Sequence, residues 1–162
     1  MTIAKGDRLP DATFLTLGAE GPAPVQAAEM LKGRTVALFA VPGAFTPTCT
    51  SAHMPSFVRT ADKLRDKGVD EIACVSVNDP FVMKAWADAT GAPGAGITVL
   101  SDPESQFTKA IGMDFTAPPA GLIARSQRYA MLVKDGVVEE LNVEDSPGTC
   151  ELSAGEALLD AM

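Results

Sequence analysis

The sequence predicts a three-layer α/β/α sandwich built around a mixed β-sheet. Short apolar runs of the kind found in strands buried on both faces alternate with amphipathic stretches of helical period. Near the end of the chain, a hairpin signal adds antiparallel strands to the parallel ones that helical crossovers imply. The length of 162 residues fits a single domain, residues 1–162, with one hydrophobic core.

The first strand and helix flank a proline-rich loop. Residues 36–41 are all apolar and a Pro-Gly pair ends the run, which predicts a buried strand. Within residues 54–64, apolar side chains recur at helical spacing with charged ones on the other side. Gly68 is a natural stop for this helix.

Two further strand–helix pairs follow. Residues 72–77 predict a second buried strand and residues 97–100 a short strand. An Asp-Pro pair after each strand supplies an N-cap and a first-turn proline for helices 79–91 and 102–111. The first of these helices is expected to carry three side chains inward: Val82, Met83 and Trp86.

The last part of the chain predicts a hairpin and a helix. Residues 129–133 and 137–143 flank an Asp-Gly pair, and both turn residues tolerate positive φ. A capping-box pattern, from Ser153 to Glu156, opens the final helix. This order of strands and helices is compatible with a thioredoxin-like sheet.

Composition and charge narrow the range of partners. The chain has 21 acidic and 13 basic residues, and its net charge is −8. A surface of that sign repels phosphate backbones and anionic lipid heads, so we expect neither nucleic-acid nor membrane binding. The start of the sequence lacks the basic and apolar stretches of a secretory signal, so we expect a cytoplasmic protein.

Three cysteines stand far apart, at Cys49, Cys74 and Cys150. Their odd number and wide spacing do not fit a disulfide framework, and no CxxC pair begins a zinc or dithiol motif. Cys74 lies within an apolar strand and is predicted to be a buried packing residue. Cys150 follows a Ser-Pro-Gly-Thr turn and is predicted to be accessible, and its reactivity stays open.

The chemistry is expected in the loop that joins strand 36–41 to the next helix. Such loops lie at the carboxyl ends of the strands, where ligand sites of α/β proteins collect. Cys49 falls at the first turn of the helix, where unpaired N–H groups and the helix dipole stabilise a thiolate relative to a thiol. Thr46 can hydrogen-bond to the sulfur or to a bound oxygen, and Pro42 and Pro47 stiffen the loop.

Two residues after the cysteine affect the same turn. Pro55 lacks an N–H and would clash with the carbonyl group of Ser51, so the helix is expected to bend or to become regular only after the cysteine turn. His53, four residues after Cys49, would neighbour it on a regular helix and form a Cys–His nucleophile pair. A role in packing or in support of the site is the favoured alternative for this histidine.

Two arginines are candidates for a positive charge beside the sulfur. Arg128 stands directly before strand 129–133, and a charge at a strand end commonly points into the crevice of the site. A guanidinium there favours the thiolate and donates hydrogen bonds to a bound oxygen. Arg125 is an equal candidate on position alone.

Three sequence blocks share one family pattern. Pro42, Thr46 and Cys49 form a proline–threonine–cysteine motif within PGAFTPTCT, and the further blocks are ACVSVNDPFVMKAW and RSQRYAMLVKDGVVEELNVE. With these blocks, the chain resembles the peroxiredoxins, specifically the type II or peroxiredoxin-5 subfamily, from about residue 3 to the C-terminus. By this resemblance, Arg128 corresponds to the family's active-site arginine and Arg125 to a nearby basic position.

The resemblance implies a thioredoxin fold without a metal or cofactor, and a thiol-dependent peroxidase that serves antioxidant defence. The Cys49 thiolate would attack the terminal oxygen of hydrogen peroxide or an alkyl hydroperoxide and become a sulfenic acid. Thr46 and Arg128 would orient the peroxide and stabilise the negative charge that develops on its oxygens. Pro42 would shield the site from water.

Family members differ in how the sulfenic acid is reduced. Some use a second cysteine near the C-terminal helix, where Cys150 stands, and others carry a cysteine at the position of Cys74 and depend on glutathione and glutaredoxin. Both positions are cysteines here, so the resolving thiol stays open, and reduction from outside by glutathione, glutaredoxin or thioredoxin is favoured. The resemblance also implies a homodimer with the active-site loop near its interface.

Two other functions are kept as alternatives. A thioredoxin-type redox carrier without peroxidase activity is disfavoured, because carriers use a CxxC pair and position 46 is a threonine. A Cys–His hydrolase would depend on His53 as its base, and it would also need an orienting group and an oxyanion hole.

Overall fold

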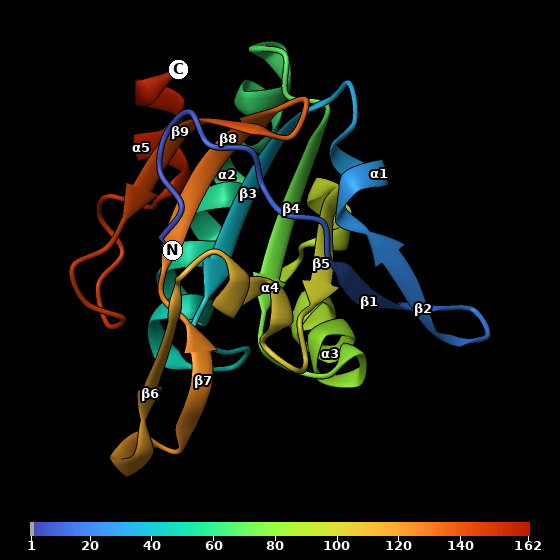
Figure 1. The fold of residues 1–162 in the computed structure, drawn as a ribbon, viewed down its shortest axis with the longest axis vertical. Helices are drawn as coiled ribbons and strands as arrows, with labels where there is room; N and C mark the ends of the chain where they lie inside the picture. Colours follow the sequence, from blue (N-terminus) through green and yellow to red (C-terminus); the bar gives the residue numbers. More distant parts are fainter. Residues whose placement is uncertain (1) are drawn as a thin grey trace.

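The structure, a computed structural model, describes residues 2–162 of the chain. Within this range, seven strands form one mixed sheet in the order β2-β1-β5-β4-β3-β8-β9. Their bounds are Thr13–Gly18 for β1, Gly21–Gln26 for β2, Thr35–Val41 for β3, Glu71–Ser76 for β4, Ile97–Ser101 for β5, Tyr129–Lys134 for β8 and Val137–Val143 for β9. Two further strands, β6 (Asp114–Ala117) and β7 (Leu122–Ser126), form a hairpin that projects away from this sheet (Figure 1).

Helices cover both faces of the sheet. The α-helices are α1 (Ala27–Leu31), α2 (Met54–Asp66), α3 (Pro80–Thr90), α4 (Gln106–Ala110) and α5 (Gly155–Ala161). Three short helical turns are η1 (Cys49–His53), η2 (Pro93–Ala95) and η3 (Pro118–Ala120). Helices α1 and α4 pack in one core, and α2, α3 and α5 pack in the other, which confirms the predicted three-layer α/β/α sandwich. None of the helices in residues 2–162 has both the length and the apolar character to cross a bilayer.

Strand β3 contributes side chains to both cores. Its residues Val36, Leu38 and Ala40 belong to the core that includes α1 and α4. The alternate residues Ala37, Phe39 and Val41 belong to the core that includes α2 and α3. Because successive side chains of a strand point to opposite faces, a strand buried on both sides needs an unbroken apolar run. This confirms the interpretation of residues 36–41.

The directions of the strands also agree with the prediction. Strands β3, β4 and β5 are parallel, whereas β8 is antiparallel to both β3 and β9. The β8–β9 hairpin turns at Asp135 and Gly136, which have φ values of 48° and 80°. Since β8 runs against β3, its first residue, Tyr129, pairs with Ala40 at the carboxyl end of β3. The mixed, thioredoxin-like sheet therefore brings the start of β8 beside the loop that contains Cys49.

Several elements lie outside the sequence prediction. Strands β1 and β2, helix α1 and the β6–β7 hairpin had no clear apolar run or helical period. Strand β2 contains Pro22 and Pro24, and each lacks the N–H that a central strand would donate. It forms the free edge of the sheet, beyond β1, where missing donors cost little.

Three details of the predicted helices were wrong. The expected capping box is absent, because the N-cap of α5 is Ala154 and the Ser153 hydroxyl donates to Glu144 instead. Val82 is only half-buried, whereas Met83 and Trp86 point inward as predicted. The helix expected after the second Asp-Pro pair, α4, begins at Gln106 and not at residue 102. The Asp102 carboxylate still accepts hydrogen bonds from N–H groups in the first turn of α4.

Candidate active site

Cys49 begins a π-helical turn, η1, that connects the β3 loop to α2. The Met54 N–H donates to the Cys49 carbonyl oxygen, five residues back, and the regular helix starts at Met54. This wider turn accommodates Pro55, which has no N–H for a regular α-helical bond. The expectation that the helix becomes regular only after the cysteine turn is confirmed. The Cys49 side chain is fully buried.

Arg128 reaches Cys49 from the start of β8. Its Nη2 atom lies 3.0 Å from the Cys49 Sγ atom. Its Nε and Nη2 atoms donate to the Pro147 carbonyl oxygen, at 3.1 and 3.0 Å, and its Nη1 atom lies 3.0 Å from His53 Nδ1. Arg128 is 2% exposed, and among residues 2–162 its guanidinium has no carboxylate at ion-pair distance. A buried charge without a counter-ion is costly, so a thiolate at Cys49 offsets that cost.

His53 supports Arg128 and does not contact the sulfur. Its Nε2 atom lies 3.0 Å from the Ser153 carbonyl oxygen and donates to it, so Nδ1 is the acceptor for Arg128. Burial, and after it the charge of Arg128, lowers the pKa of His53 to about 3. The ring is therefore neutral at physiological pH, and both of its nitrogens are occupied. This arrangement contradicts the Cys–His nucleophile pair and agrees with the alternative of a supporting residue.

The remaining predicted residues line a pocket next to the guanidinium. A cavity of about 250 Å³ is lined by Pro42, Thr46, Pro47, Thr48, Leu122, Arg128, Pro147 and Gly148. The Thr46 hydroxyl donates to the Gly43 carbonyl oxygen at 2.7 Å, so its oxygen remains free to accept a hydrogen bond from a ligand. The structure thus brings Arg128, Thr46 and Pro42 together at one pocket, and Arg128 links this pocket to the buried Cys49 sulfur.

The two arginines differ in what they contact. Arg125, in β7, donates from Nη1 to the Pro42 carbonyl oxygen at 3.1 Å, so it braces the loop and not the sulfur. Its guanidinium lies against Gly43, where an added Cβ atom would come within 2.5 Å of Nη1. Of the two arginines, which were equal candidates by sequence position, Arg128 is therefore the one that places a positive charge beside the sulfur.

Comparison with known proteins agrees with this geometry. The redoxin family model matches residues 4–159. A chloroplastic peroxiredoxin-2E-2 from Oryza sativa subsp. japonica is 50% identical over 165 residues, which cover 99% of this chain and 73% of that protein. The chain belongs to the redoxin family. Within it, the chain is a peroxiredoxin of the type II, peroxiredoxin-5-like kind, and hence a thiol-dependent peroxidase of antioxidant defence.

Solved structures of peroxiredoxins have the same fold. Reduced Prx3 from Vibrio vulnificus, in complex with H2O2, is 49% identical and superposes with a TM-score of 0.92 over 99% of both chains. Peroxiredoxin 5 from Alvinella pompejana is 33% identical, with a TM-score of 0.83 over 98% of this chain and 97% of that one. The likeness extends over nearly the whole chain, including the loops around Cys49.

The other two cysteines of this peroxiredoxin lie in different surroundings. Cys74, in β4, is fully buried, and burial, followed by the influence of Cys49, raises its pKa well above the ordinary value. The prediction of a packing residue is confirmed. Cys150 is half-buried in the loop between β9 and α5, and burial raises its pKa although Arg128 opposes this effect. All three cysteines are free thiols.

Sequence reasoning missed part of the pocket wall. Leu122, Pro147 and Gly148 line the cavity, and the Pro147 carbonyl oxygen accepts two bonds from Arg128. They come from the β6–β7 hairpin and from the loop after β9, neither of which has a motif or a hydrophobic period. No signal in the sequence would have placed them near Cys49.

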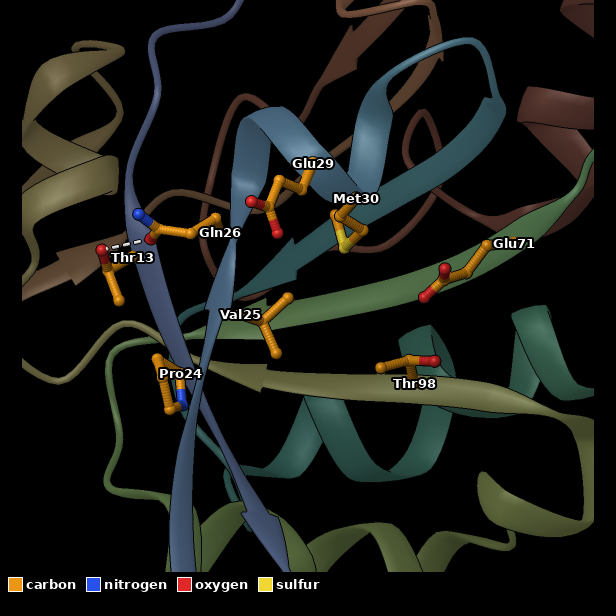
Figure 2. A pocket seen from close by; sticks show the side chains of 8 residues that line it. All are labelled: Thr13, Pro24, Val25, Gln26, Glu29, Met30, Glu71 and Thr98. Atoms are coloured by element: carbon orange, nitrogen blue, oxygen red, sulfur yellow. Dashed lines mark hydrogen bonds between the residues drawn. The ribbon is translucent and has the colours of Figure 1, made fainter.

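A larger hollow lies elsewhere, at the β1–β2 end of the sheet (Figure 2). Its volume is about 790 Å³, and it is lined by Thr13, Pro24, Val25, Gln26, Glu29, Met30, Glu71 and Thr98. It contains no cysteine or histidine, and Glu71 is paired with Arg34 at 2.8 Å. Of the motif residues, Pro42 and Thr46 line the smaller pocket, and Cys49 contacts Arg128 in its wall.

Proposed function

We propose that Cys49 is the residue of this peroxidase that attacks the hydroperoxide. Its Sγ thiolate bonds to the terminal oxygen of hydrogen peroxide or an alkyl hydroperoxide while the O–O bond breaks. The other oxygen leaves with the electron pair, takes up a proton and departs as water or alcohol, and the sulfur becomes a sulfenic acid. The contact of 3.0 Å between Arg128 Nη2 and Cys49 Sγ, beside a pocket, is the observation that carries this proposal.

Three other residues are proposed to assist this step. Arg128 supplies N–H donors that do not reorganise, since its other nitrogens are held by Pro147 and His53, and it stabilises negative charge on the leaving oxygen. Thr46 accepts a hydrogen bond from the peroxide and aligns it, because its own proton is committed to a backbone carbonyl group. Pro42, buried at the edge of the pocket, keeps water away from the sulfur.

We propose further that a thiol from outside, glutathione with glutaredoxin or thioredoxin, reduces the sulfenic acid. Cys74 is the weaker internal candidate, because it lies within a strand with neighbours on both sides and would need local unfolding. Cys150 needs only a movement of its loop and remains the internal alternative. Because Cys49 is fully buried, either route requires the surrounding loops to open.

We also propose that the protein is a homodimer and that it acts in a reducing compartment, the cytosol. Phe45, in the active-site loop, and Phe81, in the first turn of α3, are 55% and 60% exposed. The Ala44 N–H donates to Asn78 Oδ1 at 2.9 Å, which joins the active-site loop to the segment before α3. A second copy of the chain is the proposed cover for these apolar side chains. Sedimentation of the variants Phe45→Ser and Phe81→Ser and of their combination tests the dimer. These variants are expected to be monomeric, and a double variant that remains dimeric would contradict the proposal.

Rapid mixing of reduced protein with peroxide tests the central claim. Trp86 donates from Nε1 to the Thr50 hydroxyl at 3.0 Å, next to Cys49, so its emission reports on the turn. Cys49→Ser is expected to abolish the fast change, whereas Cys74→Ser and Cys150→Ser retain it. Fast peroxide consumption by Cys49→Ser would refute the assignment. Mass spectrometry of the oxidised protein with and without glutathione then identifies the resolving thiol.

A further inference from the structure

The loop between β9 and α5 supplies backbone groups to the active site. Its Pro147 carbonyl oxygen accepts two bonds from Arg128, and its Ser153 carbonyl oxygen accepts one from His53. The Gly148 carbonyl oxygen accepts a bond of 2.9 Å from the Thr48 hydroxyl, next to Cys49. This loop, residues 145–153, has no helix or strand of its own, so the aim of Arg128 depends on whatever holds the loop in place.

Glu144 is the residue that holds it. Its Oε2 atom accepts bonds from the Glu151 N–H at 2.8 Å, from the Ser153 N–H at 2.6 Å and from the Ser153 hydroxyl at 2.6 Å. Its own N–H donates to the Arg128 carbonyl oxygen at 3.0 Å, which ties it to the start of β8. The residue is 7% exposed.

The negative charge of Glu144 is stabilised by these hydrogen bonds and not by an ion pair. Burial would raise the pKa of Glu144, but the hydrogen bonds from Ser153, Leu152 and Glu151 outweigh it and bring the pKa below the ordinary value. The side chain is therefore ionised at neutral pH. Among residues 2–162, it forms no ion pair with a lysine, arginine or histidine. Its function is not to neutralise Arg128.

We propose that Glu144 is a positioning residue that closes the loop 145–153 over the site and must release it between the two half-reactions. While the loop is closed, its carbonyl groups aim Arg128 at the Cys49 sulfur, which favours reduction of peroxide. The same closure buries Cys49 and fixes the backbone directly after Cys150, so it opposes attack by a second thiol. The role given to Glu144 rests on the proposed function of Cys49. It identifies the residue that sets the balance between oxidation of Cys49 by peroxide and reduction of its sulfenic acid by a thiol.

Glu140 offers a matched control on the strand that leads to Glu144. It lies four residues earlier in β9 and pairs with Lys5 at 3.0 Å, away from the loop. Glu140→Gln and Glu144→Gln remove the same charge and keep the same side-chain size. Only Glu144→Gln weakens the acceptor of the three loop bonds.

The two half-reactions are measured separately on the full chain. In Glu144→Gln, oxidation of Cys49 by hydrogen peroxide is expected to slow about tenfold, and reaction of the sulfenic acid with glutathione to speed up about threefold or more. Hydrogen exchange should quicken within residues 145–153 and stay unchanged in α2 and β4. Glu140→Gln should match the unchanged protein in all three measurements.

A double-mutant cycle with Arg128→Gln separates positioning from general damage. If Glu144 acts through Arg128, Glu144→Gln should cost little further peroxide reactivity once Arg128→Gln is present. Additive losses, slowing of both half-reactions or unaltered exchange in the loop would each overturn the proposal. Ser153→Ala, which removes one bond only, should shift the half-reactions in the same directions by a smaller factor. A slow Cys49 in the unchanged protein would refute the proposed function instead.

Discussion

Cys49 and Cys74 are equally buried and belong to the same core, yet their surroundings differ. Each side chain is 0% exposed, and both pack in the core that includes α2 and α3. Cys74 pairs across the sheet with Phe39 and Val99, and burial raises its pKa well above the ordinary value. Cys49 instead lies against the Arg128 guanidinium at a helical turn.

With the role proposed for Cys49, this difference implies that burial does not by itself make a cysteine inert. In an apolar site, burial favours the neutral thiol, because a charge there loses its hydration. Next to a buried guanidinium without a carboxylate partner, the same loss of water strengthens the attraction between sulfur and cation. In the proposed function, the partner of the thiol, and not its exposure, distinguishes Cys49 from the packing residue Cys74.

Arg128→Gln is expected to make Cys49 resemble Cys74, and this is the largest effect predicted. Loss of the charge-assisted contact should slow peroxide reduction about tenfold or more, because such a bond contributes roughly 1.5–3 kcal/mol. Rapid-mixing kinetics measures the change. Arg125→Gln is the matched control and should cost less, since Arg125 contacts only the loop. Equal rates for Arg128→Gln and the unchanged protein, with a loss at Arg125→Gln, would reverse the assignment.

The neutral His53 behind Arg128 makes folding stability depend on pH. Its pKa is about 3 in the folded chain, against 6.5 for an ordinary histidine, so between these values only the unfolded chain binds the proton. The free energy of unfolding should therefore fall as the pH drops below about 6.5, by roughly 2 kcal/mol between pH 7 and pH 5.

Denaturant unfolding at these two pH values tests this, with His53→Gln as the comparison that should lose most of the dependence. Glu144 does not interfere, because its pKa lies below 4.5 and its contribution is lost only at lower pH. Stability that stays constant from pH 7 to pH 5 would show that His53 is not held neutral.

Cys74→Ala should have the smallest effect and none on the chemistry. Removal of one buried sulfur atom is expected to cost about 1 kcal/mol of unfolding free energy, through lost burial and a small cavity. Peroxide reduction should keep its rate. A marked fall in the rate at unchanged stability would mean that Cys74 takes part in the reaction and is more than a packing residue.

The sequence by itself determined the elements whose signals are local. The unbroken apolar run of β3, the Asp-Gly turn of the β8–β9 hairpin and the proline after the cysteine turn each depend on neighbours within a few positions. The site residues Cys49, Thr46 and Pro42 stand in one short segment, so one motif indicated them together. The edge strand β2, which has prolines and little apolar character, gave no such signal.

Only the tertiary structure decided the polar partners. Arg128 meets His53 from 75 positions away, and His53 meets Ser153 from 100 positions away, whereas Arg125 turns to the loop. Hydrophobic period and turn chemistry fix where the chain bends, but a hydrogen bond depends on ångström distances between segments that the sheet brings together. For this reason, the contacts of Glu144 with the loop 145–153 could be identified only from the folded structure.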